Sequence, residues 1–206
     1  GLASSAIVSG MAKTVICVGA LQQTKQRFGA ITSAYEHTPE TAFFSPSGLV
    51  GPGHMFALLA RRHMHKYGTT REQFAAIALA ARENALNHPE ALMRKPLTLQ
   101  DYFSAPMLAD PLCLYDFCLE SDGAIAVLVT SEERAKDLKN PPVRIVSSVH
   151  GGSRDWGRSL YWMNMPDETF VSSGNKAIAN KLYNDAGLTP SDIDTAQIYD
   201  HFTPMV

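Results

Sequence analysis

The chain has 206 residues, of which 45% are hydrophobic and 18% are charged, a balance typical of a globular protein with a sizeable buried core. Its net charge is −2, with acidic and basic residues interleaved, and this excludes the long cationic surface that nucleic acids attract. The longest apolar runs fall far short of the roughly 20 residues that cross a bilayer, so we expect neither a nucleic-acid partner nor a membrane span.

The cysteines and histidines indicate neither a disulfide framework nor a metal site. The cysteines are odd in number and lack metal-pair spacing, so we expect small buried residues in a reducing, cytoplasmic compartment: Cys17, Cys113 and Cys118. Three histidines recur near helical spacing, but no carboxylate completes a ligand set, and we expect solvent-facing or pocket-lining side chains rather than metal ligands: His54, His63 and His65.

The first elements predict alternating helix and strand. Residues 4–11 have the pattern of a helix end closed by Gly10. Residues 14–18 form a continuous apolar run, which is typical of a strand covered on both faces. Residues 22–53 are rich in Gly, Ser, Thr and Pro, and predict a long irregular connection.

Two helices follow, joined by a short turn. The first begins at Pro52 and ends where Lys66 and Gly68 supply the cation and the glycine expected at a helix end. The second begins with Thr70 as its N-cap and runs to Asn84. A short helix is predicted to start at residues 98–101.

The last third of the chain repeats the layering. Residues 124–129 predict a second buried strand, and Ser131 caps the helix after it. The best candidate domain boundary is residues 140–142, because two prolines cannot continue a helix. Beyond it, the pattern predicts a strand, an amphipathic helix ended by Gly187, and a last strand: residues 143–149, 175–185 and 195–199.

Six stretches of the chain, through their order and separation, resemble the thiolase superfamily. The resemblance is strongest to the sterol-carrier-protein-X thiolases and the lipid-transfer-protein aldolases, which cleave steroid side chains from CoA thioesters. The stretches are residues 6–10, 67–71, 84–91, 96–102, 110–126 and 199–203. The resemblance implies an α/β fold with five αβαβα layers and two similar halves, incomplete in this chain. Residues 1–140 would form the N-terminal half, including a loop region at about 22–110, and residues 141–206 would begin the C-terminal half.

The resemblance also implies partners and missing parts. It implies a homodimer, an acyl-CoA substrate and, in the lipid-transfer relatives, a small companion subunit with an OB-fold and a zinc ribbon. Members of this family are nearly twice as long as the chain, so we expect the nucleophile-bearing stretch and the last active-site loop to lie outside these residues. No cysteine here stands in the nucleophile context.

Tyr199 is the expected catalytic residue, because it stands where the family normally has Asn or His. A phenol can donate its proton at neutral pH, whereas Asn can only orient a water. Retro-aldol cleavage needs a group that takes the proton of a β-hydroxyl and a donor for the enolate oxygen, and Tyr199 could serve either role. If the last strand extends that far, we expect His201 to lie on the opposite side of the extended chain from Tyr199.

The expected substrate is a bulky acyl-CoA thioester, with a steroid side chain as one candidate for the acyl group. Coenzyme A is then part of the substrate, and no covalent cofactor is expected. The residues expected to bind the substrate come from a glycine- and aromatic-rich loop and from the last stretch, although ordinary packing explains the aromatic ones equally well: His150, Gly151, Trp156, Tyr161, Trp162, His201 and Phe202. Two alternatives stay open, a conventional thiolase or acyltransferase and a non-catalytic subunit that binds acyl-CoA or lipid.

Overall fold

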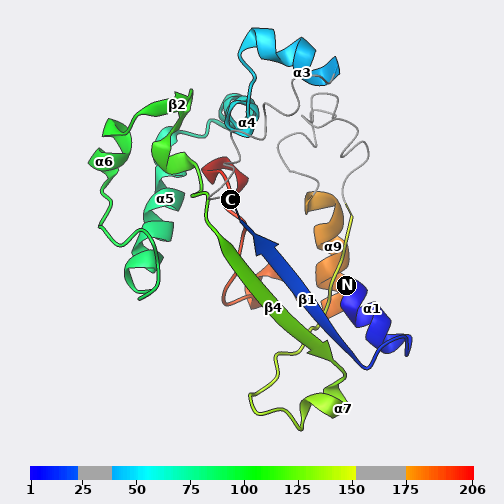
Figure 1. Ribbon diagram of the computed structural model, residues 1–206. Helices are drawn as coiled ribbons and strands as arrows, with labels where there is room; N and C mark the ends of the chain where they lie inside the picture. The colour runs from blue at the N-terminus through cyan, green and yellow to red at the C-terminus, as the bar shows by residue number, and fades with distance from the viewer. Residues whose placement is uncertain (23–38, 152–174) are drawn as a thin grey trace. The chain divides into compact units, whose positions relative to one another are not determined.

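The computed structural model describes residues 1–22, 39–151 and 175–206 (Figure 1). The chain forms two compact units, Gly1–Gln26 with Ser121–Thr195 and Arg27–Glu120 with Ala196–Val206. Helices and strands both occur, which confirms the predicted α/β class. The boundary predicted at Asn140 concerns the two halves of a larger fold and stays a prediction. No helix in the described ranges is both long enough and apolar enough to span a membrane.

The first unit is built on an antiparallel two-stranded ribbon (Figure 1). Strand β1 (Thr14–Leu21) pairs with β4 (Gly123–Thr130) along its whole length, from Thr14 opposite Thr130 to Leu21 opposite Gly123. The other elements of this unit are helices: α1 (Leu2–Val8), α7 (Glu132–Ala135), α9 (Asn175–Ala186) and the 3-10 turn η4 (Pro190–Asp192). Helix α1 contacts both strands of the ribbon.

The two predicted strands exist, but the prediction that they are covered on both faces is wrong. Ile16, Val18 and Ile125 are 63%, 70% and 71% exposed. Helix α1 leaves most of the ribbon open to solvent, and only Val15 and the end of β4 are partly buried. The apolar pattern is typical of strands covered on both faces, whereas the described residues leave most of these side chains exposed.

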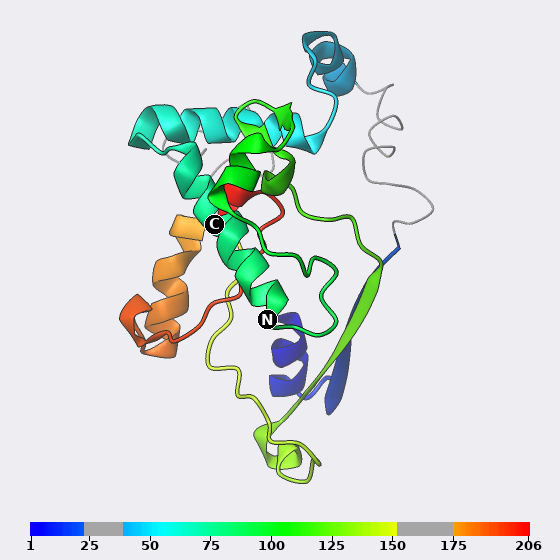
Figure 2. The same ribbon diagram turned by 90° about the vertical axis from the view of Figure 1, so that its left-hand side faces the viewer.

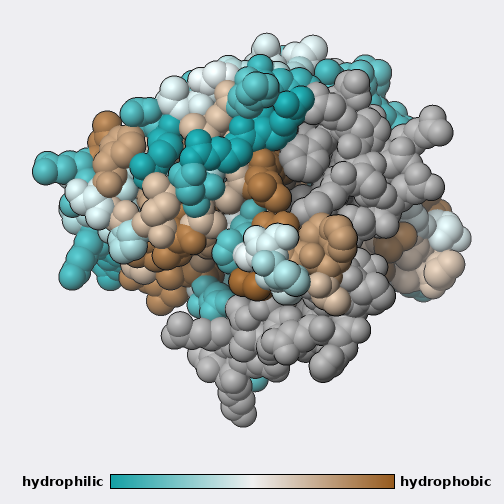
Figure 3. Space-filling model, turned by 90° about the horizontal axis from the view of Figure 1, so that it is seen from above, coloured by the Kyte–Doolittle hydropathy of each residue, from teal (hydrophilic) through white to brown (hydrophobic). Residues whose placement is uncertain are grey.

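Apolar side chains also reach the surface elsewhere, as the brown groups among the teal ones in Figure 3 show. The prediction of three buried cysteines is right for Cys113 and wrong for Cys17 and Cys118, which are exposed. Cys17 lies on the open ribbon, so the error has the same physical origin as that for the strands.

The second unit is mainly helical (Figure 2). Helix α4 (Pro52–Tyr67) begins with proline in its first turn and ends at Gly68, whose φ of +70° is the left-handed conformation that favours glycine. Helix α5 (Arg71–Leu86) begins with the capping box of Thr70 and Gln73. The remaining elements are short: α3 (Pro39–Phe44), η2 (Ser45–Ser47), α6 (Leu99–Ser104), β2 (Met107–Ala109), β3 (Leu112–Cys113), η3 (Leu114–Asp116) and η5 (Thr203–Met205).

The core of the second unit forms where α5, α6 and β3 meet. Ala75 and Ala78 of α5 are small enough for the Tyr102 ring of α6 to pack beside them, together with Cys113. Tyr102 and Cys113 are fully buried. The Arg71 guanidinium lies over the rings of Tyr102 and Phe103, at 5.4 and 5.0 Å from their centroids.

Two predicted strands and one predicted connection differ from the structure. Residues 143–149 and 195–199, predicted as strands, form no ladder with any strand in the described part of the chain. The apolar pattern of these residues therefore does not suffice to predict a strand, because the backbone of a strand also needs a partner for its hydrogen bonds. The connection predicted at residues 22–53 contains α3 and η2 within its described portion.

Candidate active site around Tyr199

Residues 199–203, which we call the Tyr199 segment, are held by the three residues that follow Tyr115. Phe117 and Phe202 form an antiparallel bridge. The Cys118 amide donates a hydrogen bond to the His201 carbonyl at 3.1 Å. The Thr203 hydroxyl donates to Oδ1 of Asp116 at 2.5 Å. The segment is therefore attached through three consecutive residues to the turn η3 and its continuation.

Aromatic packing fixes the middle of the Tyr199 segment against α4. The buried Phe202 ring stacks on Phe56, with centroids 4.3 Å apart and planes 22° apart. Phe117 meets the Phe202 ring edge-on at 5.0 Å. A side-chain carbon on Gly53, one turn before Phe56, would overlap the Phe117 ring. Glycine at position 53 therefore lets Phe117 reach Phe202.

Tyr199 projects its ring toward solvent and lies beside His201. Tyr199 is 76% exposed. The centroids of the Tyr199 and His201 rings are 4.6 Å apart, and the planes are tilted by 30°. The prediction that these two residues lie on opposite sides of the chain is wrong, because their rings lie side by side. Even in a regular strand, residues two positions apart share a face.

Burial makes the His201 imidazole less basic than usual. Its Nδ1 lies 3.3 Å from the Tyr199 carbonyl oxygen, and its ring meets the edge of Phe56 at 4.7 Å. Burial lowers the pKa of His201 from 6.5, while the Tyr199 carbonyl and the charge of Asp200 partly oppose this shift. The imidazole is therefore neutral at neutral pH, and one of its nitrogens can accept a proton.

The structure brings together three of the predicted site residues, Tyr199, His201 and Phe202. His150 and Gly151 are exposed residues of the other compact unit. Trp156, Tyr161 and Trp162 lie outside the described residues. The roles assigned to all of these residues stay predictions. The Tyr199 phenol is a proton donor, and the neutral imidazole of His201 beside it is a weak base. Acid–base chemistry at a carbonyl compound needs such a pair.

Sequence reasoning missed the buried carboxylate beneath the segment. Asp116 is 1% exposed and accepts hydrogen bonds from Tyr102, Cys113 and Thr203. Thr203 lies 87 residues from Asp116 in the chain. No local spacing links residues so far apart, and the only signal was that the Asp116 and Thr203 stretches both belong to the family-like regions.

No cluster of three or more His, Cys, Asp and Glu residues suited to a metal ion occurs within the described ranges. Of the three histidines considered, His63 has its Nδ1 2.7 Å from the Thr69 hydroxyl, and burial lowers its pKa. The Nδ1 atom of His63 is thus already hydrogen-bonded to Thr69.

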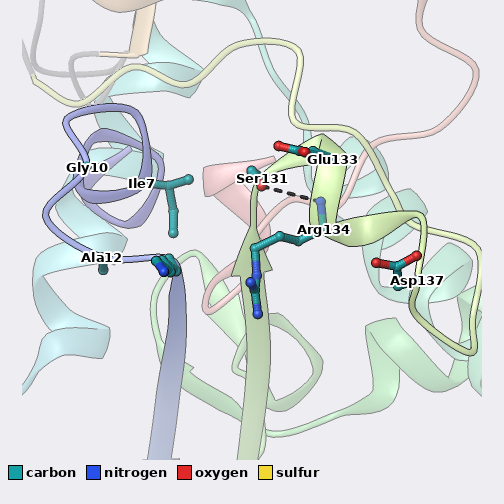
Figure 4. Close-up of a pocket in the computed structure, with 8 residues that line it drawn as sticks. Ile7, Gly10, Ala12, Ser131, Glu133, Arg134 and Asp137 are labelled. Atoms are coloured by element: carbon teal, nitrogen blue, oxygen red, sulfur yellow. Dashed lines mark hydrogen bonds between the residues drawn. The ribbon is translucent and has the colours of Figure 1, made fainter.

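A separate cavity of about 520 Å³ lies in the first unit, beside α1 and the start of α7 (Figure 4). Its charged lining residues are Lys13, Glu133, Arg134 and Asp137. The Ser131 hydroxyl caps α7 by accepting from the Arg134 amide at 3.4 Å. Because two cationic and two anionic side chains balance, the cavity offers no net attraction for an anion such as a phosphate.

Comparisons with known proteins give a consistent result. The chain is 37% identical to the 17-hydroxy-3-oxo-4-pregnene-20-carboxyl-CoA lyase of Mycobacterium tuberculosis, over 98% of this chain and 54% of the lyase. It is 34% identical to the steroid side-chain-cleaving aldolase of Thermomonospora curvata, over 99% of this chain and 54% of that protein. Among solved structures, an Ltp2-ChsH2(DUF35) aldolase matches 98% of this chain and 52% of its own chain, with 33% identity and a TM-score of 0.84. No family model matches.

The chain therefore spans about half the length of the curated relatives it matches. The resemblance to the thiolase superfamily, and within it to the group of steroid side-chain aldolases, is confirmed.

Proposed function

The chain belongs to the steroid side-chain aldolase group of the thiolase superfamily, and on this basis we propose a function. We propose that the protein containing this chain cleaves a carbon–carbon bond in a bulky acyl-CoA thioester by a retro-aldol reaction. A substrate with a steroid side chain is the best candidate, since two relatives at 37% and 34% identity have names that include a pregnene carboxyl-CoA and a steroid side chain. Coenzyme A enters as part of the substrate.

One observation supports the proposal most directly. Tyr199 presents an exposed phenol at a position where the wider family is expected to have an amide or an imidazole. The neighbouring His201 ring is partly buried and its pKa is lowered, so a neutral base lies next to the phenol. An active-site phenol buried in packed hydrocarbon would have argued against the proposal.

The reaction requires a defined set of proton movements. A base removes the proton of the β-hydroxyl group, the oxygen becomes a carbonyl, and the bond between the α and β carbons breaks. The bonding electrons pass into the thioester as an enolate, whose oxygen needs a hydrogen-bond donor. We assign to Tyr199 the hydrogen bond or proton at one of these two oxygens. The α carbon finally takes a proton, so the products are a ketone or aldehyde and a shortened acyl-CoA.

The larger architecture belongs to the same proposal. We infer five αβαβα layers from two similar halves, a homodimer, and a small partner subunit with an OB-fold and a zinc ribbon. The structurally similar aldolase carries the names of two components, Ltp2 and ChsH2, which supports a partner in the present case. The free thiols of Cys17, Cys113 and Cys118 fit the cytoplasm as the compartment.

Product analysis in a single turnover tests the proposed reaction. The complete protein, with its partner if one copurifies, is mixed in excess with a steroid β-hydroxyacyl-CoA. Retro-aldol cleavage releases a ketone or aldehyde and a shorter acyl-CoA without added coenzyme A. A conventional thiolase would leave the β-hydroxyacyl-CoA uncleaved. In a parallel reaction with the corresponding β-ketoacyl-CoA it would form an acyl-cysteine that can be trapped, and it would then transfer that acyl group to free coenzyme A. A binding subunit would return the thioester unchanged, and either of the last two outcomes would refute the proposal.

A further inference from the structure

The Asp116 carboxylate is the one charged side chain among the buried residues of the described chain, and it is held by neutral donors. The Tyr102 hydroxyl lies 2.8 and 2.9 Å from its two oxygens. The Cys113 amide donates to Oδ2 at 2.7 Å, and the Thr203 hydroxyl donates to Oδ1 at 2.5 Å. A buried carboxylate is costly unless such hydrogen bonds compensate it, and charge-assisted bonds are stronger than neutral ones.

The three donors come from three separate parts of the second unit. Tyr102 belongs to α6, Cys113 to β3 and Thr203 to η5. The α6 and β3 donors are themselves fixed in the core, because Tyr102 and Cys113 pack with Ala75 and Ala78. Asp116 therefore connects a rigid core on one side with Thr203 on the other.

Thr203 is the end of the Tyr199 segment, four residues after Tyr199. Its bond to Asp116 is followed by the Phe117–Phe202 bridge and by the bond from the Cys118 amide to the His201 carbonyl. Three consecutive residues of one strand-like stretch thus hold three consecutive residues of the other. Among these three attachments, the Asp116–Thr203 bond is the one made by two polar side chains and assisted by a charge.

We propose that Asp116 is a positioning residue that acts through Thr203 to fix the Tyr199 phenol beside His201. The effect on catalysis rests on the proposed function, whereas the effect on the position of the Tyr199 ring does not. Asp116 is assigned no contact with Tyr199 or with the substrate. Its role is to hold the backbone of the Tyr199 segment, so that the phenol meets the substrate oxygen in one orientation, since small displacements of a catalytic group are expensive.

Two isosteric changes separate positioning from folding. Thr203→Val removes only the hydroxyl that joins the segment to Asp116, and Thr203→Ser keeps it. Tyr102→Phe removes a different donor to the same carboxylate, within the core, and leaves the Thr203 bond in place. Thr203→Val and Tyr102→Phe each delete one hydroxyl bonded to the buried Asp116 carboxylate, so we expect them to lower the stability of the fold by similar amounts. Tyr102→Phe therefore controls for effects of lost stability on the rate.

The test measures kcat and KM in the complete protein at a temperature where all variants are folded. Thr203→Val should lower kcat about 10-fold or more with KM changed less than about threefold, as 1 Å misplacements do. Thr203→Ser should restore most of kcat, and Tyr102→Phe should leave kcat within about threefold. Equal losses of kcat in Thr203→Val and Tyr102→Phe would overturn the positioning role.

A spectroscopic readout keeps the inference testable if the proposed reaction is wrong. With ring-labelled tyrosine, the Tyr199 resonance should shift and broaden in Thr203→Val and Asp116→Asn, and its nuclear Overhauser contact to His201 should weaken. Thr203→Ser and Tyr102→Phe should leave that resonance unchanged. If the wild-type protein cleaves no thioester but Thr203→Val alters the Tyr199 signals, the function is refuted and the positioning is supported. If the wild-type protein is active but Thr203→Val leaves these signals unaltered, the positioning is refuted and the function stands.

Discussion

Tyr199 and His201 are two positions apart, and this spacing sets the chemistry of the candidate site. The phenol and the imidazole lie side by side, with 4.6 Å between their ring centroids. The same segment gives the two rings different environments. Tyr199 is largely exposed, whereas His201 packs against the edge of Phe56.

The contact with Phe56 yields a prediction for the titration of His201. Phe56→Ala should raise the pKa of His201 toward 6.5, because burial is the main cause of its lowered value. Nuclear magnetic resonance of the imidazole carbon-bound protons against pH measures the change. Phe43→Ala, which removes an exposed ring from α3, is the control and should leave the titration as in the wild type. A His201 pKa that stays low in Phe56→Ala would contradict the burial argument.

The lowered pKa of His201 also determines how the stability of the fold changes with pH. The folded pKa of His201 is depressed below 6.5, so the unfolded chain binds the proton more readily. The stability contributed by the neutral imidazole is therefore complete above pH 6.5 and is lost as the pH falls through the folded pKa.

At the residue scale, the sequence allowed Tyr199 to be predicted as the candidate acid but not Asp116. Tyr199 belongs to a recognisable stretch in which one residue type is exchanged for another. Asp116 acquires its position from Tyr102, Cys113 and Thr203, which meet only after folding. Burial of a carboxylate depends on such distant partners, so residue type and spacing cannot reveal it.

At the scale of elements, helix boundaries followed from local chemistry. Thr70, Thr98 and Ser131 cap helices as predicted, and Gly68 and Gly187 adopt positive φ after helices. Caps are interactions within one turn, so the sequence contains all of their determinants. Strands depend on distant partners, and this explains why two of the four predicted strands form no ladder in the described chain.

Helix α4 carries a prediction about close packing. Gly53→Ala should destabilise the second unit by about 1–3 kcal/mol, as overpacking does, because the added carbon would overlap the Phe117 ring. This cost exceeds the gain of about 1 kcal/mol expected for alanine over glycine within a helix. Chemical denaturation followed by circular dichroism measures the difference.

A rescue variant identifies the overlap as the cause. Adding Phe117→Leu to Gly53→Ala should recover part of the stability lost, so the double variant should be less destabilised than the sum of the two single variants. Gly123→Ala in β4 has no atom within 4 Å of the added carbon and should be tolerated. Strict additivity of Gly53→Ala and Phe117→Leu would show that the ring and the glycine do not interact.

At the scale of the whole molecule, the open ribbon of β1 and β4 is the main departure from expectation. The sequence predicted strands buried on both faces, and the strands carry the apolar residues that such burial requires. In the structure these side chains are exposed, including Ile16 and Val18 on one face. The apolar pattern of a strand thus indicates that the strand is suited to burial, but it does not show that the described residues cover it.

This exposure predicts a measurable surface property. The 206-residue chain by itself should bind the dye anilinonaphthalene sulfonate more strongly than Ile16→Lys/Val18→Lys, which places charges on one face of β1. Leu2→Lys, at an exposed position of α1, should change the fluorescence much less. Equal dye binding by the ribbon variant and the wild-type chain would contradict the exposure of this face.

The most direct test of the proposed chemistry is the rate of carbon–carbon cleavage by Tyr199→Phe in the complete protein. In a single turnover with a steroid β-hydroxyacyl-CoA, removing the phenol hydroxyl should slow cleavage by about 10²–10⁴-fold, the range for loss of an acid–base group, with little change in substrate affinity. Tyr67→Phe, which removes the hydroxyl of another exposed tyrosine, should cleave at the wild-type rate. Cleavage by Tyr199→Phe at the wild-type rate would contradict the role assigned to Tyr199.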